Sequence, residues 1–201
     1  MKMMSIHQLM EKQIESEVAM GNVPSLLLHS CCAPCSSACI EKLADYFHIT
    51  VFYYNPNIEN QEEYDKRANE QRRLIEQMPT KYPVHFIEGA YEPERFLEMV
   101  RGHEKEAEGG SRCELCFRMR LTMTATVAKE QKMDYFTTTL TISPLKNATL
   151  INRLMEELAK VHEIQYLASD FKKKEGYKRS IELSKEYNLY RQNYCGCMFS
   201  K

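Results

Sequence analysis

The chain has 201 residues, of which 43% are hydrophobic and 27% charged, and its formal net charge is −1. This length and composition are typical of a single globular domain with a substantial core, and the sequence contains no repeat or low-complexity tract. Since no apolar run approaches the roughly 20 residues that cross a bilayer, the sequence also excludes a membrane-spanning protein.

The N-terminal segment, "MKMMSIHQLMEKQIESEV", alternates apolar and charged residues and lacks the apolar centre of a signal peptide. We predict that residues 1–22 form an amphipathic helix or a loose arm, which precedes a single α/β domain over residues 23–201. Since the sequence shows neither a signal peptide nor a membrane span, we expect a cytoplasmic protein, and thiols stay reduced in that compartment.

Segments rich in apolar, β-branched or aromatic residues alternate with helical patterns along the rest of the chain. Strands are predicted at residues 25–30, 49–55, 82–89, 133–141 and 164–169. Helices are predicted at residues 36–46, 61–77, 92–100, 114–131 and 143–162. The last helix is expected to have Ser143 as its cap and Pro144 at its first position. Residues 101–112 are predicted to be a polar loop.

This alternation favours a Rossmann-like parallel sheet with helices on both faces. In such folds, ligands bind beyond the carboxyl ends of the strands. Four polar or cysteine-rich segments follow predicted strands directly, namely "CCAPC", "NPN", "TISP" and "DFKKK". We therefore expect these segments to converge at one rim of the sheet and to form a single active site.

Most of the eight cysteines occur in local groups, "CCAPC", "CELC" and "CGC". In a reducing compartment, grouped cysteines are typical of metal-binding or redox sites rather than of structural disulfides. Cys39 is different, because it would lie on the helix that follows the first group, and we expect it to be a core residue. The other seven are candidate site residues: Cys31, Cys32, Cys35, Cys113, Cys116, Cys195 and Cys197.

Thiolates are soft ligands that suit zinc and iron–sulfur clusters. The two-residue gap between Cys113 and Cys116 lets both sulfurs face one metal centre. Adjacent side chains diverge, so we expect Cys31 and Cys32 to serve a larger cluster, or two neighbouring centres, rather than one small ion. The spacing favours an iron–sulfur cluster, and zinc remains the alternative.

The C-terminal "CGC" has a different character from the other groups. Cys195 and Cys197 are separated only by Gly196 and would close a tight, strained disulfide, which is typical of labile or catalytic pairs. The alternative is that both are additional metal ligands. The sequence has neither a G-x-G-x-x-G loop nor a Walker loop, so a metal is the expected cofactor in place of a nucleotide.

Basic residues concentrate toward the C-terminus. Residues 151–201 contain ten Lys/Arg and seven Asp/Glu, and five of the basic residues lie in "DFKKKEGYKR". A compact basic patch attracts phosphates, although a solvated helix face would have the same composition.

Five motifs together resemble the QueH-type epoxyqueuosine reductases. They are "LLLHSCCAPCS", "YYNPNI" with "EEYDKR", "SRCELCFRMRL", "FTTTLTISPLKN" and "DFKKKEGYKRSIELSKEYNLYRQNYCGCMFS". The motifs occur in order from about residue 25 to the end of the chain. The resemblance implies a fold similar to that of the adenine-nucleotide α-hydrolase-like (HUP-type) proteins, and a catalytic domain that carries a metal site.

The resemblance also implies an activity and its cofactors. Such enzymes remove the epoxide oxygen of epoxyqueuosine at the tRNA wobble position in a two-electron reduction, which gives queuosine in the last step of its biosynthesis. They carry a [4Fe–4S] cluster, with a second, mononuclear iron nearby. The expected cluster ligands are Cys31, Cys32, Cys113 and Cys116. Cys35 is a candidate ligand of the second iron, and Cys195 and Cys197 are the expected redox-active pair.

The resemblance implies two partners: a tRNA that carries epoxyqueuosine, and a separate low-potential electron donor. It implies no association with a membrane. The residues expected to bind tRNA phosphates are Lys172, Lys173, Lys174, Lys178, Arg179 and Arg191. Candidate stacking residues are Tyr177, Tyr190 and Tyr194, whereas Tyr53 and Tyr54 better fit the core. Candidate proton donors are Asp170, Tyr190 and Tyr194.

Two other classes of function remain open at this point. One is a zinc-binding module that contacts RNA without catalysis. The other is a thiol-based tRNA sulfur-transfer enzyme, which would need a nucleotide loop that the sequence lacks.

Overall fold

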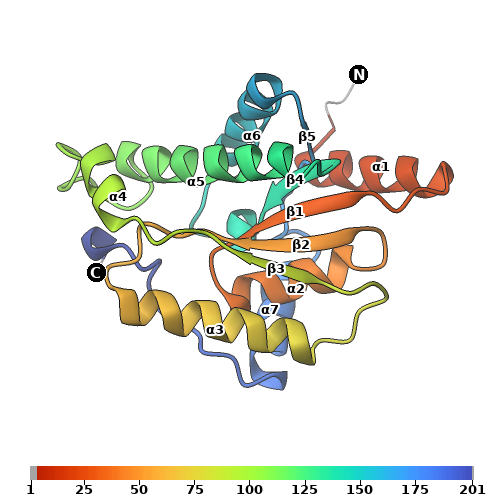
Figure 1. Ribbon diagram of the computed structural model, residues 1–201, viewed down its shortest axis with the longest axis horizontal. Helices are drawn as coiled ribbons and strands as arrows, with labels where there is room; N and C mark the ends of the chain where they lie inside the picture. Colours follow the sequence, from red (N-terminus) through yellow and green to blue (C-terminus); the bar gives the residue numbers. More distant parts are fainter. Residues whose placement is uncertain (1–3, 201) are drawn as a thin grey trace.

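The computed structural model describes residues 4–200, so residues 1–3 of the predicted N-terminal arm lie outside the described residues. Five parallel strands form one sheet in the order β3-β2-β1-β4-β5 (Figure 1). Their bounds are β1 Ser25–Ser30, β2 His48–Tyr53, β3 His85–Glu88, β4 Tyr135–Thr138 and β5 Gln165–Tyr166. The predicted parallel sheet with helices on both faces is therefore confirmed.

The central strand β1 separates two parts of the hydrophobic core. Leu26 and Leu28 face one side of the sheet and Leu27 faces the other, as the two-residue period of a strand requires. On the first side pack α1 Ile6–Ala19, α2 Ala33–Leu43, α3 Gln61–Gln77 and α7 Gly176–Glu186. On the second pack α4 Pro93–Met99, α5 Ser111–Glu130 and α6 Ala148–His162. Figure 1 shows α5 above the sheet, with α2, α3 and α7 below it.

Within the predicted N-terminal segment, Ile6–Ala19 form the helix α1. Ser5 and Gln8 form a capping box at its start, which satisfies backbone donors of the first turn. Met10 and Ile14 are buried against the core, and the Gln13 side chain bonds to the backbone of Tyr166 and Ala168 beside β5. Of the helices in the described part of the chain, none combines the length and the hydropathy needed to cross a bilayer.

Several predicted boundaries differ from the structure near the carboxyl ends of the strands. α2 and α5 begin three residues earlier than predicted, at Ala33 and Ser111, so that Cys35 and Cys113 lie in first helical turns. The predicted strand over residues 133–141 ends at Thr138, and Thr139–Ile142 form the short 3-10 helix η1. The third and fifth predicted strands are likewise shorter, at four and two residues.

The predicted start of α6 was wrong. Residues 143–146 form a turn in which the Lys146 amide donates to the Ser143 carbonyl at 3.3 Å. The helix begins only at Ala148, because the side chain of Asn147 accepts a hydrogen bond from the Leu150 amide and acts as the cap. This turn leaves Lys146 at the rim of the sheet rather than inside a helix.

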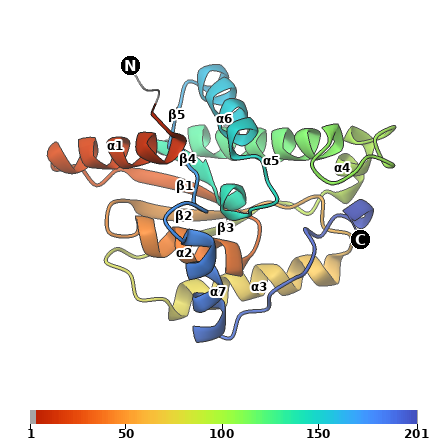
Figure 2. The same ribbon diagram turned by 180° about the vertical axis from the view of Figure 1, so that it is seen from behind.

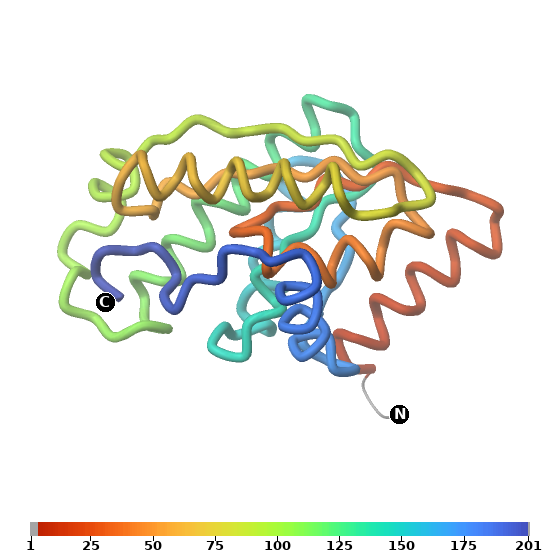
Figure 3. The backbone as a smooth tube through the Cα atoms, turned by 90° about the horizontal axis from the view of Figure 1, so that it is seen from below, coloured from red at the N-terminus to blue at the C-terminus, as the bar shows by residue number. Residues whose placement is uncertain are grey.

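The helix α7 was not predicted from the sequence. Its first residue, Gly176, lies very close to the backbone of Phe171. A Cβ atom on Gly176 would lie 1.9 Å from the Phe171 carbonyl oxygen, so only glycine permits this close approach. α7 packs against α2. The chain after α7 then returns along α3, as Figures 2 and 3 show, which brings "CGC" back to the cysteine loop.

Candidate metal and thiol centre

The first cysteine group lies where β1 ends and α2 begins. β1 ends at Ser30, and Cys32 is the extended N-cap residue of α2, with φ −174° and ψ 160°. Pro34 lies in the first turn, where its missing amide hydrogen costs no helical hydrogen bond. Cys35 follows in the same first turn of the helix. The loop therefore opens at the carboxyl end of the central strand.

The sulfurs of Cys31, Cys32 and Cys35 all lie within 4.8 Å of one another. The two adjacent sulfurs are 3.9 Å apart, so the expectation that these side chains diverge was wrong. Cys32 is the extended N-cap residue and Cys35 lies in the first turn of α2, so the start of this helix brings Cys35 beside the adjacent pair. Three converging thiols are close enough to bind one metal ion.

Mutual hydrogen bonds divide the protons unequally in this group of three thiols. The Cys32 and Cys35 thiols donate to the Cys31 sulfur and lower its pKa well below the ordinary value, and the charges of Arg120 and Lys146 act in the same direction. The pKa of Cys35 is raised, chiefly by its bonds to the other two. Cys31 is therefore the sulfur of the three that loses its proton most readily, and metal binding would release the remaining thiol protons.

The second cysteine pair lies on the first turns of α5. Cys113, Cys116 and Arg120 share one helical face, because they are spaced at three and four residues. The Gly109 amide donates a hydrogen bond to the Cys113 sulfur at 3.2 Å. Burial raises the pKa of Cys116, opposed by a hydrogen bond and charge from Arg120.

Two adjoining cavities bring the cysteines together. The larger, about 500 Å³ in volume, is lined by Cys31, Cys32, Cys35 and Cys195. The smaller, about 80 Å³, is lined by Cys113, Cys116, Cys195 and Cys197. Arg120, Lys146 and Cys195 line both cavities. Seven of the eight cysteines thus meet at one rim of the sheet.

This donor set suits a thiolate-bound metal centre. The four predicted cluster ligands divide between the two cavities, Cys31 and Cys32 in the larger, Cys113 and Cys116 in the smaller. Their soft sulfur donors fit iron or zinc, and the cations that line both cavities fit an anionic group. Cys39 is fully buried and its thiol donates to the Cys35 carbonyl at 3.3 Å, which confirms it as a core residue.

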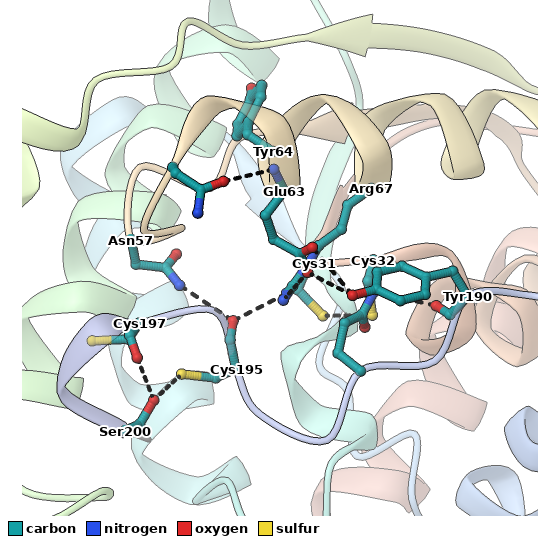
Figure 4. Close-up of polar contacts among 12 residues, drawn as sticks. Cys31, Cys32, Asn57, Glu63, Tyr64, Arg67, Tyr190, Cys195, Cys197 and Ser200 are labelled. Atoms are coloured by element: carbon teal, nitrogen blue, oxygen red, sulfur yellow. Dashed lines mark hydrogen bonds and ion pairs between the residues drawn. The ribbon is translucent and has the colours of Figure 1, made fainter.

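The C-terminal "CGC" is fastened to the loop and helix that follow β2 (Figure 4). The Cys195 carbonyl accepts from Asn57 Nδ2 at 3.4 Å and from Arg67 Nη1 at 3.3 Å. Gly196 has φ +101°, and a Cβ atom there would lie 3.0 Å from Ile58 Cγ1 and 3.1 Å from Arg67 Nη1. Glycine is therefore required at this position by both conformation and space.

Both "CGC" cysteines are free thiols in this structure. Hydrogen bonds from the Cys197 thiol and from Ser200, together with the charge of Lys146, lower the pKa of Cys195 to about 5. The hydrogen bond between the two thiols raises the pKa of Cys197. A thiolate beside a protonated thiol is the arrangement from which thiol–disulfide exchange begins.

A comparison with known proteins decides the family. The family model described as epoxyqueuosine reductase QueH matches residues 26–201, nearly the whole chain. The chain belongs to the QueH family.

Curated members of the QueH family cover most of the sequence. The chain is 46% identical over 184 residues to the epoxyqueuosine reductase QueH of Staphylococcus epidermidis, across 90% of this chain and 77% of that protein. It is 47% identical over 181 residues to that of Staphylococcus aureus, across 88% and 75% of the two chains. Identity to the Thermotoga maritima protein is 33% over 182 residues, which cover 88% of this chain and 90% of that protein.

The tyrosines predicted from the QueH resemblance occupy different surroundings. Tyr53 and Tyr54 are buried in the core, as expected. Tyr177 and Tyr194 line the larger cavity, and the Arg191 guanidinium lies 5.5 Å from the centre of the Tyr177 ring. The Tyr190 hydroxyl instead donates to Glu63, which also pairs with Arg67 at 2.6 Å.

The basic residues predicted to bind tRNA form two groups. Arg191 lines the larger cavity. The others lie on or just before α7, where Lys173 and Lys174 are exposed. Ion pairs neutralise the remaining three: Lys172 with Asp170, Lys178 with Glu175, and Arg179 with Glu41, Glu182 and Glu186. Asp170 is thus engaged by a lysine and is not among the residues that line either cavity.

Three basic residues at the site were missed in the sequence. Arg120 is detectable from its helical spacing to Cys113 and Cys116. Lys146 lies in "TISPLKN", the segment after the fourth strand. The sequence predicted that this segment was helical from residue 143, and only the observed helix start at Ala148 places Lys146 in the turn at the rim. Arg67 gave no signal beyond its four-residue spacing from Glu63, which is common on helix surfaces.

The lowered pKa of Cys195 predicts its pH-dependent reactivity. In the reduced, metal-free protein, alkylation of Cys195 should be nearly constant between pH 6 and 8, because it is already a thiolate, and should fall only as the pH drops through about 5. Cys197→Ala removes the thiol that donates to the Cys195 sulfur, so the rate should then rise with pH toward an ordinary thiol pKa near ~8.5. The measurement is mass spectrometry of the Cys195 peptide after timed iodoacetamide treatment.

Cys197→Ser is the matched control for this prediction, because its hydroxyl can still donate to the Cys195 sulfur. It should keep most of the flat profile. A wild-type rate that still climbs about tenfold per pH unit up to pH 8 would show that Cys195 is an ordinary thiol.

Proposed function

We propose that this chain is an epoxyqueuosine reductase, which removes the epoxide oxygen of epoxyqueuosine at the tRNA wobble position and yields queuosine. The observation that carries the proposal is the match of residues 26–201 to the QueH family model. It is supported by the convergence of seven cysteines on two adjoining cavities, as a reductive metalloenzyme requires.

The proposed cofactor is a [4Fe–4S] cluster held by Cys31, Cys32, Cys113 and Cys116. Cys35, as the third sulfur beside Cys31 and Cys32, is the proposed ligand of a second iron. Such centres supply electrons singly and, as Lewis acids, polarise an oxygen ligand. The support for this assignment is the soft donor set and the shared wall of the two cavities.

The proposed electron and proton balance involves the "CGC" pair. Conversion of an epoxide to an alkene consumes two electrons and two protons and releases water. Oxidation of Cys195 and Cys197 to a disulfide supplies the two electrons, so one pair matches one turnover. Because Cys195 is already a thiolate at neutral pH, the pair supplies one proton, from Cys197, and solvent water supplies the second. A low-potential electron donor must then reduce the pair again. The free state and unequal proton affinities of the two thiols support this role.

The larger cavity is the proposed site of the modified base. Its volume of about 500 Å³ lies within the range of small-molecule sites. A wobble base lies in a single-stranded loop, so it can enter a cavity without disrupting a helix and can stack on aromatic side chains. Tyr177 and Tyr194, which line this cavity, are the proposed stacking residues, and Arg191 is the proposed phosphate contact. Of the three candidate proton donors, Tyr194 is the one that lines this cavity.

The three converging sulfurs of Cys31, Cys32 and Cys35 also suit zinc. A zinc-binding RNA module is therefore the second candidate function. It differs from the first in metal content and in the absence of turnover, and both are measured below.

The experiment that tests the proposal is a single-turnover reaction under anaerobic conditions. The iron-loaded protein is incubated with epoxyqueuosine-containing tRNA and a low-potential reductant, and the nucleosides are separated after digestion. We expect conversion of epoxyqueuosine to queuosine. Unchanged epoxyqueuosine with a fully loaded iron site would favour the RNA-binding alternative.

Cysteine variants separate metal ligands from the redox pair in the same assay. Cys113→Ser and Cys116→Ser should lose iron and activity together, because a hydroxyl is a poor substitute for thiolate. Cys195→Ser and Cys197→Ser should retain iron and lose turnover by at least about tenfold. Cys39→Ser, in the core, is the control and should retain both. If the "CGC" variants lose iron as completely as Cys113→Ser, these thiols are ligands instead.

A charge-reversal variant tests the proposed tRNA surface before α7. Changing Lys172, Lys173 and Lys174 together to Glu should weaken tRNA binding and flatten its dependence on salt, because each lost phosphate contact lowers the salt slope by about one. Dissociation constants measured at several salt concentrations give both quantities.

The control for this variant carries the same change of net charge elsewhere. Lys81, Lys105 and Lys132 are exposed and line neither cysteine cavity. Their joint change to Glu should alter the salt slope less. Equal effects of the two triple variants would mean that only the overall charge matters.

A further inference from the structure

Arg120 is a buried cation at the junction of the two cysteine cavities. Arg120 is 3% exposed, and it lines both the larger and the smaller cavity. It projects from the same face of α5 as Cys113 and Cys116. Lys146 also lines both cavities, but it belongs to a surface turn and is less deeply buried.

The hydrogen-bond partners of Arg120 are neutral. Its Nη2 donates to Asn55 Oδ1 at 2.5 Å, and its Nε donates to His29 Nε2 at 3.4 Å. Burial and the charge of Arg120 lower the pKa of His29 to about 3, so this imidazole carries no charge at neutral pH. Within residues 4–200, no carboxylate lies within ion-pair distance of Arg120.

The other two deeply buried arginines are compensated within the protein. Arg67 forms an ion pair with Glu63 at 2.6 Å. Arg112 donates to backbone carbonyls, among them those of Glu104 at 2.8 Å and Phe199 at 3.2 Å. Arg120 has only the two neutral side-chain partners named above, so an anion beside it would offset the cost of its buried charge.

Thiols of both cysteine sets lie in the cavities that Arg120 lines, Cys31 in the larger and Cys116 in the smaller. Glu108 and Lys146 also line both cavities, and Glu108 forms no ion pair with Arg120 among the described residues. A group that both sets hold through thiolates would be anionic and would lie against this guanidinium. One-electron reduction makes such a group more negative, so a fixed cation beside it stabilises the reduced form.

We propose that Arg120 is the counter-cation of the thiolate-bound iron centre at the junction of the two cavities, and that it raises the reduction potential of that centre. The inference rests on the proposed function for the presence of iron. Arg120 acts through the centre and is a positioning residue. The contacts with Asn55 and His29 fix its guanidinium at the junction.

The test is a redox titration of the anaerobically purified, iron-loaded protein, followed by visible absorption and electron paramagnetic resonance. Arg120→Met and Arg120→Gln both remove the charge, and Gln keeps a polar group near Asn55. At the potential where the wild type is half reduced, each should show a reduced-to-oxidised ratio at least about tenfold lower, which is 59 mV for one electron. Arg120→Lys should restore most of the potential.

Arg118→Met is the matched control, because Arg118 lies on the same helix but is exposed and pairs with Glu157 at 3.0 Å. Its potential should not change. If uncharged variants fold but fail to retain iron while Arg120→Lys retains it, the charge is needed for assembly and the inference holds. Loss of iron from folded Arg120→Lys as well would overturn it, as would unchanged potentials in loaded variants. A wild type without iron would instead refute the proposed function.

Discussion

The parallel pairing of β1 with β2 on one side and β4 on the other determines where the functional groups of this protein lie. The register places Ser30 beside Tyr53 and His29 beside Thr138. All three strands therefore end at one rim, and the segments that follow them meet there. The Cys31–Cys32 loop, Asn57 and Lys146 come together by this constraint alone, although they are distant in sequence.

The remaining cysteines reach this rim by two other routes. The first turns of α5 carry Cys113 and Cys116 to it, and the chain after α7 returns along α3 with Cys195 and Cys197. Arg73 holds the start of that return through the carbonyls of Tyr187 and Asn188. Arg67 holds its end through the Cys195 carbonyl. Cys195 and Cys197, the proposed redox pair, are thus held in place through the Cys195 carbonyl rather than through their sulfurs.

Composition and spacing predicted much of this arrangement. Contiguous apolar strands and intervening helical patterns were sufficient for the parallel sheet, because such strands are buried on both faces. The gathering of site residues at one rim was also predictable, because "CCAPC" follows a predicted strand and "CELC" lies at the start of a predicted helix. Only "CGC" has no such neighbour. Local geometry was harder. The cap at Cys32 has no side-chain signal, and Asn147 competes with Ser143 as a helix cap, so both helix starts and the convergence of Cys31 with Cys32 were missed.

Arg120 shows a second limit of sequence analysis. Helical spacing relates it to Cys113 and Cys116, but its meaning depends on which residues face it from other elements. Only the packed structure shows that Asn55 and His29 are its neighbours and that no carboxylate of the described chain pairs with it. The charge of Arg120 and the converging thiols both support the anionic metal–thiolate group that we propose for this site.

The most direct test of this account is the metal and sulfide content of the wild-type protein after anaerobic purification. The account predicts iron together with acid-labile sulfide, in the amount of about four irons or more per chain that a [4Fe–4S] cluster requires. Stoichiometric zinc without iron or sulfide would contradict it.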